Sequence, residues 1–145
     1  MNKHGTTSDY IDDRNKALLK AYREVMLRPY PIYWREVMNI VVNTPCERFW
    51  VSEEEATRVM RRMIYAKIIK RSTPIRREMY QEIYNRVIAL REANPGMTIA
   101  DATFRVVNSP APKFYITPSS AYVIIQRTKK KCYEERKRRL RHLFG

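Results

Sequence analysis

The sequence contains very little glycine, and this scarcity excludes several kinds of fold and site. Only 3 glycines occur among 145 residues, against 8 prolines. They stand at positions 5, 96 and 145, so the chain has no glycine-rich loop that would cradle a phosphate group. Loop-rich and all-β chains need more glycine than this. The composition therefore favours helices that end at prolines.

Cysteine and histidine are equally scarce, which leaves few groups for metal binding or catalysis. Cys46 and Cys132 stand far apart without a CxxC spacing, and His4 and His142 lie near opposite ends of the chain. Neither a zinc module nor a disulfide framework can be read from this pattern. Nucleophilic catalysis needs a base beside the nucleophile, which these positions do not supply. We expect no enzymatic activity, no cofactor, no metal site and no small-molecule substrate.

Long apolar runs are also missing. No run approaches the roughly 20 residues that a membrane-spanning helix needs, and the N-terminal residues lack the apolar core of a signal peptide. We therefore expect a cytoplasmic protein without a membrane partner, associated with the nucleoid if it binds DNA.

Positive charge, in contrast, is abundant. Lysine and arginine number 29 against 15 acidic residues, which gives a formal net charge of +14. Solubility alone is satisfied by a net charge of about 2 to 8 in a small domain. The excess predicts a polyanionic partner such as nucleic acid.

The chain also contains an internal repeat. An offset of 65 residues aligns residues 41–62 with residues 106–127 without a gap, and 7 of the 22 positions are identical. Unrelated segments of ordinary composition would share roughly one. The sequence therefore predicts two copies of one structural unit.

Each copy is expected to begin with two helices. The second helix of the second copy begins at Thr98 and ends at Asn108, which we expect in a left-handed conformation ahead of Pro110. Asn43 and Pro45 are the equivalent residues of the first copy. The first helices are amphipathic, with apolar residues at spacings of three and four: Leu18, Leu19, Tyr22 and Val25 in one copy, and Ile83, Tyr84, Val87 and Leu90 in the other.

A third helix follows in each copy, capped by Ser52 or Thr117. A short aromatic segment precedes each cap, at residues 48–51 and 113–116, and its composition suits an extended, half-buried turn. The third helices place their apolar residues on one side: Ala56, Val59, Met60 and Met63, and then Ala121, Ile124, Ile125 and Thr128.

The predicted fold class is therefore all-α, with two tandem three-helix units that repeat at an offset of 65 residues. A short extended aromatic segment is expected before each third helix. Thr73 and Pro74 are typical of the start of the second copy's first helix, which we expect to run to about Ala93. The predicted segments are a flexible N-terminal part (1–13), the first unit (14–71), the second unit (72–128) and a basic helical extension (129–145).

Basic residues gather in two blocks at equivalent positions of the two copies. Residues 58–77 carry eight bases and no acid, and residues 129–141 carry eight bases and two acids. A single charged helix face is usually only solvated. Two blocks at repeat-equivalent positions, with almost no compensating acid, favour phosphate binding.

A three-helix unit whose third helix is capped, amphipathic and followed by bases resembles the helix-turn-helix class of DNA-binding proteins, over residues 14–71 and 79–128. The resemblance implies that the third helix lies in the major groove of duplex DNA. One feature departs from the class. Eight residues connect the second and third helices, where the motif has a turn of three or four.

We expect the second copy to read the bases, because Glu53, Glu54 and Glu55 would repel phosphates at the start of the first copy's third helix. Trp50 and Tyr115 either pack in the core or stack on the bases of a single strand. The candidate nucleic-acid-binding residues are Arg48, Arg58, Arg61, Arg62, Lys67, Lys70, Arg71, Lys113, Ser119, Ser120, Tyr122, Gln126, Arg127, Lys129, Lys130, Lys131, Arg136 and Lys137.

The sequence thus predicts a non-enzymatic nucleic-acid-binding protein, with duplex DNA as the preferred ligand, acting as a small regulator or as an accessory factor of a mobile element or virus. Two alternatives stay open: a structural or assembly protein that forms homo-oligomers through its helices, and an RNA-binding module. A membrane-surface role for residues 129–145 is less favoured, because apolar residues are sparse there.

Overall fold

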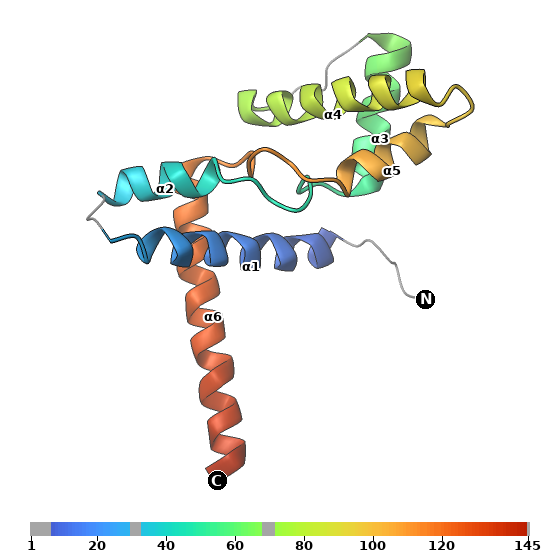
Figure 1. The fold of residues 1–145 in the computed structure, drawn as a ribbon. Coiled ribbons are helices and arrows are strands. Elements are labelled where there is room, and N and C mark those ends of the chain that lie inside the picture. The colour runs from blue at the N-terminus through green and yellow to red at the C-terminus, as the bar shows by residue number, and fades with distance from the viewer. Residues whose placement is uncertain (1–6, 30–32, 68–71, 145) are drawn as a thin grey trace.

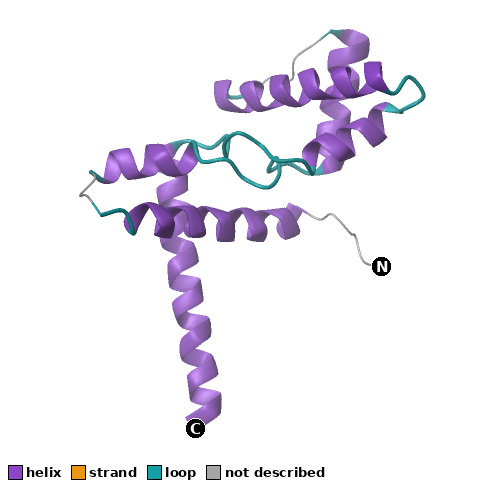
Figure 2. Ribbon diagram, viewed as in Figure 1, coloured by secondary structure: helices purple, strands orange, loops and turns teal. Residues whose placement is uncertain are grey.

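The computed structural model describes residues 7–29, 33–67 and 72–144, and all regular structure in these ranges is helical (Figures 1 and 2). This confirms the predicted all-α class. The elements are α1 (Thr7–Met26), α2 (Trp34–Val42), α3 (Glu53–Arg61) with the π-helical turn η1 (Arg62–Ala66), α4 (Pro74–Ala93), α5 (Ile99–Val107) and α6 (Pro118–Phe144).

Four helices begin at the hydroxyl residues that the sequence predicts. In each case the side-chain oxygen accepts a hydrogen bond from the backbone N–H three residues later, which satisfies one of the free donors of the first helical turn. These N-caps are Ser52, Thr73, Thr98 and Thr117. The start of each of these four helices is therefore fixed by local chemistry.

The asparagines that follow α2 and α5 correct one prediction. Neither is left-handed, since φ is −95° at Asn43 and −91° at Asn108. Each side-chain amide instead donates to a carbonyl oxygen four residues earlier, at 2.8 Å for Asn39 and 2.9 Å for Phe104. A side chain that satisfies a free carbonyl group at the helix end removes the need for a left-handed residue.

The flexible part of the chain before the first helix is also shorter than predicted. Residues 7–13, predicted to be flexible, form the first turns of α1. The apolar face of this helix extends back to Tyr10, which is half-buried against the core. Its ring centre lies 5.8 Å from the guanidinium carbon of Arg48. Packing of Tyr10 thus favours the helical conformation in this segment.

Each third helix packs in a core formed mainly by the other half of the sequence. One core joins α3 to α4 and α5 and contains Met60, Ile83 and Val106, while the other joins α6 to α1 and α2 and contains Leu18 and Ile125. Figure 1 shows the result as two lobes, one with α1, α2 and α6 and the other with α3, α4 and α5, and connecting segments that cross between them. The expected consecutive three-helix units are therefore not the groups of helices that pack together.

The two crossing segments make reciprocal contacts. Cys46 and Ala111, which are repeat-equivalent, exchange both backbone hydrogen bonds at 3.0 and 2.9 Å. The N–H of Phe49 donates to the carbonyl oxygen of the last residue of α5. The N–H of Phe114 donates to the carbonyl oxygen of the last residue of α2, and both N–O distances are 2.9 Å. Each contact maps onto its counterpart by the 65-residue offset. The crossing therefore has an approximate twofold symmetry.

The length of the connection explains the exchange. At about 3.3 Å per residue, eight residues reach roughly 26 Å, whereas a turn of three or four would hold the second and third helices side by side. The eight-residue connection departs from the helix-turn-helix motif, and its length is what lets each third helix cross to the other lobe.

The aromatic segments at residues 48–51 and 113–116, expected as extended, half-buried turns, contain no strand, and their four aromatic rings are buried and not half-buried. Each segment contains bends, and Tyr115 has a φ of 55°. Among the described residues, the β-bridge of this region joins Cys46 and Ala111, which precede the two aromatic segments. The backbone turns sharply here because each segment must leave one lobe and cap a helix in the other.

Candidate nucleic-acid interface

Helix α6 presents the candidate base-reading residues of the second copy to solvent. It packs on α1 and α2 through the side that carries Ala121, Ile125 and Thr128. Side chains on the other sides of the same turns are exposed, and these include all five candidates: Ser119, Ser120, Tyr122, Gln126 and Arg127.

The second half of α6 extends away from the lobes. Cys132 still packs against the core of α1 and α2, but every residue from 133 to 144 is exposed. Figure 1 shows this half running outward to the C-terminal end. Among the described residues, no ion pair joins its bases to a carboxylate. Its charged residues are Glu134, Glu135, Arg136, Lys137, Arg138, Arg139 and Arg141.

Three candidate lysines link the two halves of α6. Lys129 is half-buried, and its ammonium nitrogen lies 4.7 Å from the ring centre of Tyr22 on α1. Lys129 therefore makes a cation–π contact inside the protein. Lys130 and Lys131 are exposed and continue the basic surface of the outer half.

The end of α3 is the equivalent surface of the first copy, and its charge is more mixed. Arg58 pairs with Glu55, and Lys67 ends the turn of η1 in a left-handed conformation with a φ of 53°. Three acids occupy the first turn of α3, whereas α6 has none there. The exposed candidates are Arg58, Arg61, Arg62 and Lys67, while Lys70 and Arg71 lie outside the described residues.

Arg48 and Lys113, the candidates within the crossing segments, make internal contacts. The guanidinium of Arg48 donates to the carbonyl oxygens of Phe49 and Val51, at 3.0 and 2.7 Å. Lys113 pairs with the carboxylate of Glu78 on α4. Both side chains are largely buried. These two cations stabilise the crossing and are not part of the exposed basic surface.

The four aromatic residues of the crossing belong to the hydrophobic cores. Phe49 stacks on Tyr115 with ring centres 5.9 Å apart, and Trp50 stacks on Phe114 at 6.3 Å. All four are buried. Of the two interpretations of Trp50 and Tyr115, core packing is therefore the one that the structure bears out, because rings enclosed in this way are not accessible to a base.

Exposed aromatic rings occur outside the crossing segments, and the amino-acid sequence gives little indication that they are exposed. Trp34 begins α2 and is 58% exposed, and its ring centre lies 5.5 Å from that of Tyr122 on α6. The one available signal is its position outside the apolar face of α2, which Val37, Met38 and Val41 form.

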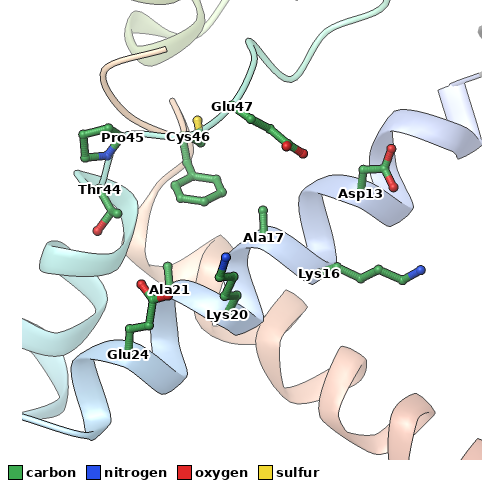
Figure 3. A pocket seen from close by; sticks show the side chains of 11 residues that line it. Asp13, Lys16, Ala17, Lys20, Ala21, Glu24, Thr44, Pro45, Cys46 and Glu47 are labelled. Carbon is green, nitrogen blue, oxygen red and sulfur yellow. The ribbon is translucent and has the colours of Figure 1, made fainter. Parts of the chain in front are cut away.

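A groove of about 430 Å³ lies between α1 and the segment after α2 (Figure 3). Its rim carries charges of both signs, such as Lys20, Glu24 and Glu47. Burial raises the pKa of the Cys46 thiol to about 11, so the thiol is protonated at neutral pH. Its single S–H points toward two backbone carbonyl acceptors, those of Arg48 and Lys113, at sulfur–oxygen distances of 3.3 and 3.4 Å. A protonated, hydrogen-bonded thiol is a poor nucleophile, so the groove offers no activated one.

Among the side chains that the structure describes, in residues 10–29, 33–67 and 72–144, no group of three or more histidine, cysteine, aspartate or glutamate residues is placed to bind a metal ion. In the same ranges, no helix combines the length and the apolar character that crossing a membrane requires.

Comparison with known proteins adds no relative. No family model, no curated protein and no solved structure matches this chain. A proposal about function must therefore be argued from the surface of the molecule.

Proposed function

We propose that this protein binds duplex DNA through α6 and catalyses no reaction on it. The observation that carries the proposal is the outer half of this helix, in which residues 133–144 are all exposed while five of them are lysine or arginine. A helical segment that does not touch the core gains little from the fold itself, so its positive surface is available to a partner.

The dimensions of an exposed helix favour B-form DNA. An α-helix with its side chains is about 10–12 Å across, and the major groove of B-DNA is about 12 Å wide. The major groove of A-form RNA is too narrow and deep for side chains to read. Duplex DNA is therefore the preferred ligand, and structured RNA is the alternative to be compared with it.

The placement of the charges favours contact with both strands. Residues 136–139 are four consecutive bases, and successive residues of a helix point about 100° apart. The four side chains thus surround the helix, and a helix in the groove would place cations toward the phosphates on either side. Ser119 and Gln126, nearer the lobes, supply hydrogen-bonding groups suited to base edges.

We also propose that the two halves of the chain are copies of one three-helix unit that have exchanged their third helices. The bounds of α2 and α5 differ by the repeat offset, as do the first residues of α3 and α6. In this arrangement α1, α2 and α6 together correspond to a helix-turn-helix-like unit whose groove-binding helix comes from the other half.

Assembly through α6 is the second candidate function. Leu140, Leu143 and Phe144 are exposed near the end of the helix, with 85% of Phe144 accessible. Such residues could meet the same segment of another copy. Sedimentation of the DNA-free protein as a dimer that dissociates on Leu140→Gln and Phe144→Gln substitution would favour this candidate.

Neutralisation of the outer half of α6 tests the DNA proposal. We expect the variant Arg136→Gln, Lys137→Gln, Arg138→Gln and Arg139→Gln to bind duplex DNA on the order of 100-fold more weakly at low salt, because these cations no longer neutralise phosphates. The slope of log affinity against log salt should flatten by about 0.9 for each phosphate that is no longer neutralised. Fluorescence anisotropy with duplex DNA, single-stranded DNA and RNA at two salt concentrations measures both quantities.

A matched control removes the same charge from the lobes. The variant Lys16→Gln, Lys20→Gln, Arg23→Gln and Arg105→Gln changes four exposed residues and leaves α6 intact. We expect it to retain most of the duplex affinity. Equally weakened binding in the two variants, or no duplex binding by the folded wild type, would refute the proposal.

A further inference from the structure

One end of the molecule carries an aromatic patch that the basic surface does not account for. It involves the first residue of α2, Trp34, and Tyr122 near the start of α6, two helices that Figure 1 shows in the same lobe. Trp34 and Tyr122 meet there with their rings tilted by 50°, and Tyr33 beside them is 82% exposed. The outer aromatic patch consists of Tyr33, Trp34 and Tyr122, which are all exposed.

The fold does not require exposed aromatic residues at this junction. The other lobe makes the same junction between α5 and α3 with Ile99 and Thr57, which are the repeat equivalents of Trp34 and Tyr122 and are both buried. Exposed aromatic surface is unfavourable in water, so an exposed ring pair at this junction of one lobe, where the equivalent residues of the other lobe are buried, indicates a binding role.

Polar groups with the chemistry of nucleotide recognition surround Trp34. The guanidinium carbon of Arg35 lies 5.9 Å from its ring centre. An open cavity of about 520 Å³ beside the ring is lined by Trp34, Arg35, Glu36, Asn39, Pro118 and Ser119. An exposed ring provides a face for stacking, the amide and hydroxyl groups can bond to a base edge, and the guanidinium can meet a phosphate.

We infer that the outer aromatic patch binds an unpaired base of the same nucleic acid that contacts the outer half of α6. This inference rests on the proposed function and narrows its ligand to a duplex with an adjoining single-stranded or bulged nucleotide. Tyr122 and Arg136 lie on one helix, about 21 Å apart at 1.5 Å per residue. That distance corresponds to about six base steps of 3.4 Å. One DNA molecule therefore spans both surfaces.

Tryptophan fluorescence tests this assignment directly. Trp50 is 4% exposed within the crossing, so Trp50→Phe leaves Trp34 as the single accessible emitter. The wild type and Trp34→Phe serve as references for folding and for the signal of Trp50. The two ligands are a blunt duplex of about 20 base pairs and the same duplex with a single-stranded overhang of about six thymines. An overhang of this length spans the distance from the outer half of α6 to the patch.

We expect the overhang to quench Trp34 by roughly half and to raise affinity about tenfold over the blunt duplex, since each stacked base contributes measurably to binding. Trp34→Ala should abolish this preference and leave blunt-duplex affinity unchanged. Equal affinity for both ligands without quenching of Trp34, while the α6 variant still weakens duplex binding, would overturn the inference and leave the proposed function standing.

Two further outcomes would also overturn it. Failure of every DNA to bind would remove the proposed function together with the inference. A change in Trp34 emission with protein concentration alone, accompanied by dimer formation in sedimentation, would show that a second copy of the chain covers the patch.

Discussion

At the scale of single residues, the crossing between the lobes is stabilised by cations that stack on aromatic rings. The Arg48 guanidinium lies 5.8 Å from the ring centre of Trp50, and the Lys113 ammonium lies 5.4 Å from that of Tyr115. The two pairs are repeat-equivalent. A cation–π contact in a partly desolvated site contributes on the order of 1–2 kcal/mol. Arg48 and Lys113, which the sequence suggested as phosphate ligands, thus stabilise the fold.

Cys46 and Tyr115 should make stability depend on pH in the alkaline range. Burial raises the pKa of the Cys46 thiol from 9.0 to about 11, and that of the Tyr115 hydroxyl from 10.0 to about 12. Both groups are neutral when protonated, so folding favours the protonated form. Their contribution to stability is complete below their ordinary pKa values and is lost as the pH rises toward the raised values.

We therefore expect the free energy of unfolding to fall between about pH 9 and pH 11. Urea titrations at several pH values measure it. Cys46→Ala places the repeat-equivalent residue at this position, and should reduce the slope, because alanine carries no ionisable group. Adding Tyr115→Phe should reduce it further. An alkaline slope that is the same in the wild type and in the double variant would contradict this prediction.

At the scale of elements, α6 consists of two parts with different roles. Its first part completes the core of α1 and α2, where Ala121 and Ile125 are fully buried, whereas its outer part is exposed throughout. Lysine, arginine and glutamate are good helix formers. Arg141 and His142 in the last turn also suit the negative end of the helix dipole. Local propensity therefore favours the helix where packing does not.

Substitutions in the two parts of α6 should differ in their effect on stability. We expect Ile125→Ala to lower the free energy of unfolding by about 2–4 kcal/mol, because it removes buried surface and leaves a cavity. Leu140→Ala, at an exposed position, should change it by less than about 0.5 kcal/mol. Urea denaturation followed by circular dichroism compares them. Similar destabilisation at both positions would show that the outer half packs on the protein.

At the scale of the whole molecule, the exchange of third helices makes each half depend on the other. Residues 1–71 supply α1 and α2 to one core and α3 to the other, and residues 72–145 do the converse. Neither half holds the three helices of a complete core in the arrangement of the intact protein.

The separated halves should therefore not fold as monomers. We expect residues 1–71 and residues 72–145, produced as two chains, to lack a cooperative unfolding transition at low concentration, because each lacks the helix that fills its core. Mixing them should restore helicity and give a one-to-one complex. Circular dichroism and sedimentation provide the measurements. A folded monomer of either half would contradict the exchanged arrangement.

The sequence by itself determined the features that depend on neighbouring residues. Helix starts follow from side-chain caps such as Ser52 and Thr98, and apolar faces follow from spacings of three and four. The helical class, the caps and the core residues of α3 were therefore predictable. The basic composition of the outer half of α6 was equally predictable, since it requires no knowledge of packing.

Only the tertiary structure decided which third helix completes which core. The apolar faces of α3 and α6 are built from the same kinds of residue, so the local pattern fits either lobe, and the choice depends on how the two connections cross. The same crossing buries Trp50 and partly buries Arg48, whereas Trp34 stays exposed because it begins α2 outside the apolar face. Side-chain exposure depends on contacts between residues far apart in the chain, and a local pattern does not contain them.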